Sequence, residues 1–328
     1  MRRIVVTGAA GFIGSHLCEA LVAAGEQVIG VDSCITGRLG NLATIADHPR
    51  FRLIQKKVTH TRRALRDADA IIHLAAHVGP PHVVQYAHAV IRDHLADALV
   101  ISDAVKHSDA RLLVASSSEV YGGAIPPHVE TDALMIGPTD AARSAYAASK
   151  VAVEHLMLRN HPERATVMRF FNVAGPRQRA EGGCVLPLWV AGALHAGHHR
   201  GTFLLHDAEH QRAFADVADV VRCIVALLDC EGSVGEVVNV GQPEPIRMGA
   251  LAEMVADSVE AATGHRPEIR HAQRGTGSNG SAFMPIRYPD VTKLRALIGF
   301  VPPNRMRASV DAVVAEQCGQ TMRPAEVA

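Results

Sequence analysis

The sequence predicts an α/β protein: a doubly wound parallel sheet followed by a smaller C-terminal α/β domain. Apolar runs typical of buried strands alternate with helical patterns as far as residue 172, which indicates a parallel sheet covered by helices. Beyond Asn172 the alternation lapses, and Gly, Pro and His become frequent. We therefore expect one domain over residues 1–172, extended by about 215–240, and a second formed mainly by residues 173–328.

Composition narrows the class of protein further. Of 328 residues, 48% are apolar, and 33 Lys and Arg balance 33 Asp and Glu. We expect a sizeable core, and neither nucleic acid nor a membrane surface as a partner. The six cysteines form no C-x-x-C pair, which favours free thiols in a reducing compartment. With no signal peptide or bilayer-spanning stretch recognised in the sequence, we expect a soluble, cytoplasmic protein.

The first strand, residues 4–6, runs into three glycines at a G-x-x-G-x-x-G spacing: Gly8, Gly11 and Gly14. A helical pattern opens there with Phe12 and Ile13. Such a turn lets backbone N–H groups approach a pyrophosphate at the helix N-terminus. The next strand, residues 27–32, ends in Asp32, whose carboxylate can accept ribose hydroxyls and repels a 2′-phosphate. The pattern predicts an NAD site; the alternative is a glycine-rich turn between core elements.

The following elements complete the predicted sheet. We expect strands at residues 51–55, 70–76, 111–115 and 167–172, and helices at 87–106 and around Tyr146 to Lys150. Arg38, in the loop after the second strand, is placed to reach the adenosine side of a dinucleotide. The strand at 70–76 ends in Leu74, Ala75 and Ala76, small enough at its tip to pass close to the cofactor.

The second half of the chain is less regular. Helices are expected at residues 185–194, 217–228 and 248–262, the last ended by Gly264, and strands at 202–205 and 237–240. Residues 266–283 are polar and glycine-rich and show no pattern that predicts an element. We expect the tail after Gln317 to be loose.

Tyr146 and Lys150 lie four residues apart, so on a helix they share one face. A free phenol has a pKa near ~10, and a neighbouring ammonium together with a positive nicotinamide ring would favour the phenolate, a usable base. Alone, such a pair is more often a solvated surface pair. Here it follows the glycine fingerprint, the acid after the second strand and the serine cluster at residues 116–118, and this order favours a catalytic role.

These motifs resemble the extended short-chain dehydrogenase/reductase family, in its NAD-dependent nucleotide-sugar epimerase/dehydratase branch, of the UDP-glucose 4-epimerase type. The resemblance runs from about residue 3 to about residue 315. It implies a Rossmann-type domain, a C-terminal domain that binds a nucleotide-diphosphate sugar, and catalysis by Ser117, Tyr146 and Lys150. Ser117 would hydrogen-bond the reacting sugar hydroxyl, Tyr146 would be the base, and Lys150 would hold the nicotinamide ribose. The implied substrate ligands are Ser117, Ser118, Asn172, Arg212 and Arg287.

Glu119 bears on the reaction type. The family's 4,6-dehydratases place Asp-Glu after the catalytic Thr, whereas here Ser118 replaces the Asp. Decarboxylases of uronic acids carry Ser-Glu but continue with Asp-Glu-Gly-Lys-Arg after the Tyr, where this chain has Ala-Ala-Ser-Lys-Val. Neither signature is whole, so epimerisation at C4 through a 4-keto intermediate is favoured, with Glu119 as a further catalytic candidate or a structural residue. Dehydration and decarboxylation stay open as alternatives, and a non-catalytic NAD-binding scaffold is the remote one.

Two departures from the family touch the cofactor. Lys57 stands where relatives carry an adenine-binding Asp, and His94 begins the segment that replaces N-V-x-G-T, so the affinity and adenine contacts of NAD are open. The histidines at residues 195–199 suggest a metal site, but they fit a helix C-terminus better and lack further ligands; we expect no metal. Surplus apolar positions on the helices at 87–106 and 144–159 predict a homodimer, unless both helices only pack on the sheet.

Overall fold

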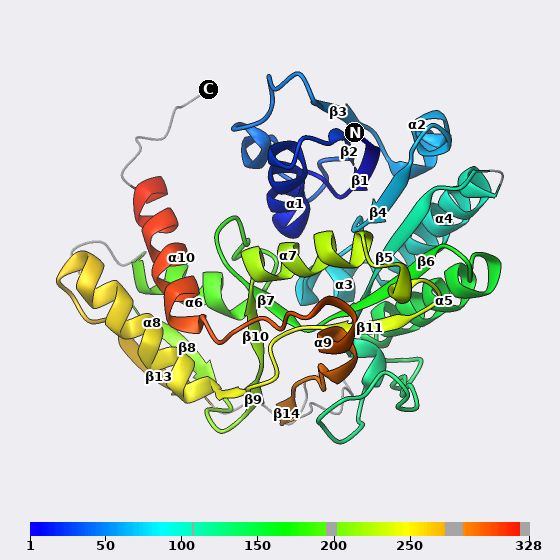
Figure 1. Ribbon diagram of the computed structural model, residues 1–328. Helices are drawn as coiled ribbons and strands as arrows, with labels where there is room; N and C mark the ends of the chain where they lie inside the picture. Colours follow the sequence, from blue (N-terminus) through cyan, green and yellow to red (C-terminus); the bar gives the residue numbers. More distant parts are fainter. Residues whose placement is uncertain (107, 195–201, 273–284, 322–328) are drawn as a thin grey trace.

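The computed structural model describes residues 1–106, 108–194, 202–272 and 285–321. Its centre is a seven-stranded, all-parallel sheet with the strand order β11-β6-β5-β4-β1-β2-β3 (Figure 1). The predicted doubly wound fold is confirmed. The strands are β1 (Arg3–Thr7), β2 (Gln27–Asp32), β3 (Phe51–Gln55), β4 (Ala70–His73), β5 (Arg111–Ser117), β6 (Ala165–Phe170) and β11 (Val237–Val240).

Helices cover both faces of this sheet, which explains why its central strands are mainly apolar. Successive residues of β1 point to opposite faces: Ile4 and Val6 join one core cluster and Val5 joins the other. The first cluster is closed by α1 (Phe12–Ala23), α7 (Val217–Leu228) and α9 (Thr292–Ile298). The second is closed by α2 (Arg62–Arg66), α4 (Ala87–Val105) and α5 (Ser144–Asn160), with α3 (Pro80–Gln85) before α4.

A smaller part lies beside the sheet, at the left of Figure 1. It packs α6 (Val185–Leu194), α8 (Met248–Thr263) and α10 (Met306–Thr321) around a core of its own, together with the parallel pair β8 (Thr202–His206) and β13 (Glu268–Ala272). Short pairs join it to the sheet: β7 (Asn172–Ala174) with β10 (Phe214–Asp216), and β9 (Gln211–Arg212) between β12 (Ile246–Arg247) and β14 (Ile286–Arg287). Gly264 ends α8 in the left-handed region, as expected.

Four expectations about element bounds need correction. The strand expected at 70–76 ends at His73, because its partner β1 stops at Thr7 and the next N–H groups bond Thr7 itself. The strand expected at 167–172 breaks at Phe171, whose N–H donates to Val240 before the chain leaves to pair with β10. β13 arises where no element was expected, since it is held by pairing with β8. Lastly, α10 continues past Gln317 to Thr321.

The apolar surplus on α4 and α5 is smaller than the sequence suggests. Val90, Ile101 and Val153 are buried within the single chain, while Ile91 and Leu99 remain 39% and 53% exposed. The homodimer therefore stays a prediction that rests on fewer positions. In the residues described, no helix combines the length and apolarity needed to cross a membrane.

Candidate active site

The turn between β1 and α1 depends on glycine, above all at positions 8 and 14. Gly8 has φ +73°, and a Cβ there would lie 2.9 Å from the Ala75 nitrogen. A Cβ on Gly14 would lie 2.1 Å from the Gly8 oxygen, and one on Gly11 would lie 3.0 Å from the same atom. The turn, the start of α1 and the residues after β4 are therefore packed backbone to backbone, which is the cradle that a dinucleotide pyrophosphate requires.

Asp32 ends β2 beside this turn and is 9% exposed. Its carboxylate accepts hydrogen bonds from the Ala10 N–H at 2.9 Å and the Cys34 N–H at 2.7 Å, so its position is fixed by the backbone on both sides. The nearby Arg38 donates to Glu181 at 3.2 Å. Leu74, Ala75 and Ala76 follow β4 half-buried, as Phe12 and Ile13 do at the start of α1. This donor set and shape fit NAD.

The structure brings Ser117, Tyr146 and Lys150 together from two elements. Ser117 is the last residue of β5, and its hydroxyl lies close enough to the hydroxyl of Tyr146 on α5 to act on the pKa of that phenol. One turn later, Lys150 is 4% exposed, with Nζ 5.8 Å from the centroid of the Tyr146 ring. This Nζ donates to the Ala115 carbonyl oxygen at 2.8 Å, so the carboxyl end of β5 holds both catalytic candidates of α5.

Burial decides the pKa values of these groups. It raises the pKa of Tyr146 well above its usual range, with the Glu119 charge acting in the same direction and the Ser117 hydrogen bond opposing it. Burial also lowers the pKa of Lys150 to about 8, against the charge of Glu154. In the chain alone, burial thus acts against the expected lowering of the Tyr146 pKa. The lowering by the ammonium together with a bound nicotinamide ring stays a prediction.

Glu119 lies between two guanidinium groups. Its Oε1 accepts hydrogen bonds from Arg143 at 3.1 Å and from Arg287 at 2.8 Å. Burial acts to raise the pKa of Glu119, but the charges and hydrogen bonds of Arg287 and Arg143 hold it below its usual range. Glu119 thus joins the end of β5 to a residue 168 positions later. Arg143 belongs to none of the sequence motifs, so no local pattern marks it as part of the site.

The residues expected to bind the substrate come from separate elements: Arg212 and Arg287 from the short strands β9 and β14, Asn172 from β7, and Ser118 from the position directly after β5. Arg212 and Arg287 are register partners in the parallel pair β9–β14, which places them side by side. Arg212 Nη1 donates to the Gln211 and Pro285 carbonyl oxygens at 2.8 and 2.9 Å. Asn172 donates to the Ala213 oxygen at 3.1 Å, and Ser118 is buried next to Ser117. Arg287 thus belongs to the strand pair that is expected to hold the diphosphate, and its side chain also contacts Glu119.

Beneath Lys150 lies a buried polar network that no sequence motif indicates. Glu154, one turn later on α5, accepts hydrogen bonds from Arg169 Nε at 3.0 Å and Nη2 at 2.7 Å, and from the Ser116 hydroxyl. Arg169 also donates to the Tyr121 hydroxyl at 3.0 Å. Both charged side chains are 5% exposed, so the pair fixes α5 to β5 and β6 inside the core.

His94 forms a second fixed link to the catalytic helix. Its Nε2 accepts from the His77 N–H at 2.8 Å, and its Nδ1 lies 2.8 Å from Ser149 Oγ, which donates to the Tyr146 carbonyl oxygen. Burial lowers the pKa of His94 to about 2, so the ring is neutral and Nδ1 is its donor. The residue that departs from the family pattern therefore supports the backbone of Tyr146.

No group of three or more His, Cys, Asp or Glu side chains suited to a metal ion is found within the described ranges. The histidines at positions 195, 198 and 199 lie outside the described residues, so the expectation of no metal at this cluster stays a prediction. All six cysteines are free.

Comparison with known proteins agrees with this geometry. The model of the NAD dependent epimerase/dehydratase family matches residues 4–241. UDP-glucuronic acid decarboxylase 4 of Arabidopsis thaliana is 32% identical over 318 residues, which cover 95% of this chain and 68% of that protein. UDP-N-acetyl-alpha-D-glucosaminuronate decarboxylase of Bacillus cytotoxicus is 31% identical, covering 92% and 93% of the two chains.

Solved structures show the same fold over almost the whole chain. UDP-glucuronic acid 4-epimerase from Bacillus cereus, in complex with UDP-glucuronic acid and NAD, superimposes with a TM-score of 0.82 at 25% identity, covering 97% and 99% of the two chains. UDP-N-acetylglucosamine 4-epimerase from Methanobrevibacter ruminantium gives 0.85 at 24% identity and the same coverage. The glycine cradle, the acid after β2 and the match over residues 4–241 agree: the chain belongs to the NAD-dependent epimerase/dehydratase family and is an NAD-dependent enzyme of that class.

Proposed function

We propose that the protein is an NAD-dependent 4-epimerase of a nucleotide-diphosphate sugar, acting through a 4-keto intermediate. The observation that carries the proposal is the meeting of Ser117, Tyr146 and Lys150 beside the glycine cradle. We also propose that the enzyme works in the cytoplasm, in keeping with its six free cysteines.

In this proposal each residue has a role that its position supports. Ser117 and Tyr146 bind the O4 hydroxyl of the sugar, and Tyr146 takes its proton as general base. Lys150, with a pKa of about 8, is charged at neutral pH; it orients the nicotinamide ribose and stabilises the phenolate. Bound NAD supplies the hydride acceptor at C4 and a positive ring charge, and it is held by the glycine cradle and Asp32. Arg212 and Arg287 hold the diphosphate, where guanidinium groups match phosphate oxygens.

A second candidate is decarboxylation of a nucleotide-linked uronic acid at the same site. It is supported by Arg143, which meets Glu119 close to Tyr146, since a guanidinium group suits a substrate carboxylate. The relatives from Arabidopsis and Bacillus cytotoxicus are uronic acid decarboxylases by name. Epimerisation remains our first choice because residues 147–151 lack the decarboxylase signature.

The test is product analysis by NMR with UDP-glucose, UDP-N-acetylglucosamine and UDP-glucuronic acid as substrates. Inversion at C4 supports the first proposal. Loss of CO2 from UDP-glucuronic acid, yielding a pentose, supports the second and overturns the first. Tyr146→Phe should fold and bind NAD normally but lose at least ~100-fold in turnover, as expected for a lost general base. Wild-type-like turnover by Tyr146→Phe would refute both mechanisms.

A further inference from the structure

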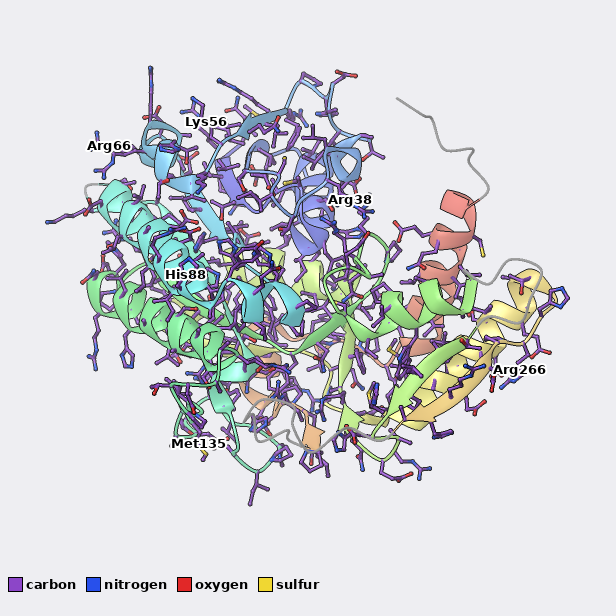
Figure 2. The ribbon with its side chains drawn as sticks, turned by 180° about the vertical axis from the view of Figure 1, so that it is seen from behind. Arg38, Lys56, Arg66, His88, Met135 and Arg266 are labelled. Carbon is purple, nitrogen blue, oxygen red and sulfur yellow. The ribbon has the colours of Figure 1, made fainter. Side chains whose placement is uncertain are left out.

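The balanced total charge hides an uneven distribution. Residues 50–66 contain seven Lys and Arg and no Asp or Glu, in a chain whose 33 basic and 33 acidic residues cancel. This segment runs from the residue before β3 to the end of α2. Figure 2 shows Lys56 and Arg66 at one end of the molecule, away from Arg266 on the smaller part. The overall balance therefore does not exclude an anionic partner at this end.

The fold turns the segment into one side of a cleft. Ile54 packs in the cluster on the α2 face, and Phe51 and Leu53 pack in the other cluster, so alternation places Arg52 and Lys56 on the α2 face. α2 has only five residues and leaves part of this face uncovered. The result is a cleft of about 650 Å³, with Ile29 and Ile54 among its apolar lining.

Cations dominate the rim of this cleft, which we call the basic cleft. Its charged lining is Arg3, Arg50, Arg52, Lys56, Arg63 and a single carboxylate, Asp67. The side chains of Arg50, Arg52, Lys56 and Arg63 form no ion pair or hydrogen bond with any part of the chain that the structure describes. Neighbouring Arg62, by contrast, pairs with Asp103 at 3.5 Å. Like charges gathered without counter-charges repel one another, and a bound anion relieves that repulsion.

The basic cleft is separate from the cofactor cradle. Its lining residues Arg3 and Gln27 stand at the amino ends of β1 and β2, whereas Gly8 and Asp32 lie at or beyond the carboxyl ends of the same strands. The cleft runs along β3 as far as Lys56, just beyond the carboxyl end of that strand. None of Gly8, Gly11, Gly14 and Asp32 is among its lining residues, so a ligand there does not occupy the pyrophosphate turn.

We propose that the basic cleft binds a small molecule that carries a chain of phosphates, at a site distinct from the active site. Its volume lies within the ~300–1,000 Å³ typical of small-ligand pockets. Guanidinium groups match phosphate oxygens, and several of them together favour a multiply charged phosphate over a single carboxylate. The apolar lining accommodates a ring attached to the phosphates. The ligand is thus a nucleoside triphosphate or an inorganic polyphosphate, which share this chemistry.

The test is calorimetric titration of the NAD-saturated protein, in the presence of excess UDP, with tripolyphosphate and with ATP. Excess UDP and NAD fill the nucleotide sites of the proposed enzyme, so binding reports on another site. We expect both probes to bind, and Arg52→Gln/Lys56→Gln to weaken each at least tenfold. The matched control Arg159→Gln/Arg295→Gln removes two exposed cations elsewhere and should change the Kd less than twofold. If ATP binds more tightly than tripolyphosphate, the ligand is a nucleoside triphosphate. If the two bind equally, the cleft recognises the phosphate chain alone.

Absence of binding by both probes would overturn the proposal, as would equal weakening by the two double variants. Thermal unfolding of both variants checks that they fold; if the double variant does not, Arg52→Gln alone should weaken binding at least threefold. The test needs no turnover, so its result is independent of the reaction that the active site performs.

Discussion

Replacing Lys150 by methionine removes the ammonium that is buried beside Tyr146, and it should change how stability depends on pH. Lys150 is 4% exposed, and burial lowers its pKa from the ordinary 10.5 to about 8. The difference between these pKa values corresponds to about 3 kcal/mol. This is the free energy by which burying the charged form, rather than the neutral amine, destabilises the fold.

The sign follows from which state holds the proton. Below pH 8 the ammonium is charged in both the folded and the unfolded chain, so its burial costs the full amount. Between pH 8 and 10.5 the unfolded chain binds a proton that the folded protein does not, and stability rises with pH. Above 10.5 the amine is neutral in both states, and the cost has vanished. The unfolding free energy of the wild type, relative to Lys150→Met, should therefore rise by about 3 kcal/mol from neutral pH to about pH 10.5.

Urea unfolding at pH 7, 8, 9 and 10 measures this difference without substrate or cofactor. Comparison with Lys150→Met cancels the other groups that titrate in the alkaline range, and loss of the hydrogen bond to Ala115 shifts the curves by a constant amount. Lys106→Met is the matched control, since Lys106 is exposed, and its difference from the wild type should stay flat. A Lys150→Met difference that is equally flat, or that falls with pH, would refute a buried ammonium of lowered pKa.

Three further outcomes are expected. Glu154→Leu should destabilise the protein by about 3–5 kcal/mol in urea unfolding, because it leaves Arg169 charged and unpaired in the core. The double variant Glu154→Leu/Arg169→Met should recover most of that loss. If the losses of the two single variants add up in the double variant, the pairing is contradicted. His94→Ala should lower the free energy of unfolding by at least about 2 kcal/mol, because it leaves buried hydrogen-bond partners unpaired, and it should lower kcat more than it raises KM. His94→Asn should retain more of the stability and more of kcat than His94→Ala does. An unchanged kcat in His94→Ala would exclude a positioning role. Light scattering at micromolar concentration should give twice the 35.0 kDa mass of one chain, and Leu99→Asp should reduce the share of dimer; a mass of one chain for the wild type would refute the dimer.

The parts of the site that the sequence predicts are those that depend on local spacing. Gly8, Gly11 and Gly14 constrain one turn, and Tyr146 and Lys150 lie on one face of a helix whatever packs around it. In each case neighbours in the chain are neighbours in space, so the spacing alone carries the geometry.

The parts that escape the sequence depend on long-range contacts. Arg143 and Arg287 reach Glu119 from 24 and 168 positions away, and His94 reaches Ser149 across 55. The residues of β13 are mostly exposed, and their sequence shows no apolar alternation. The strand is formed by its pairing with β8. Such partners follow from the assembled fold, which no local pattern encodes.

The route of the chain between the two parts has a consequence for any attempt to divide the protein. After β7 the chain builds α6 and β8, returns to the large sheet for α7 and β11, leaves again for α8, and comes back once more for α9. A fragment cut at residue 172 would lack the helix that packs on α1 and the edge strand beside β6. We therefore expect that neither part folds on its own when it is separated from the other. Insertions and gene fusions should therefore be tolerated at surface turns inside the two parts, and not at a boundary between them.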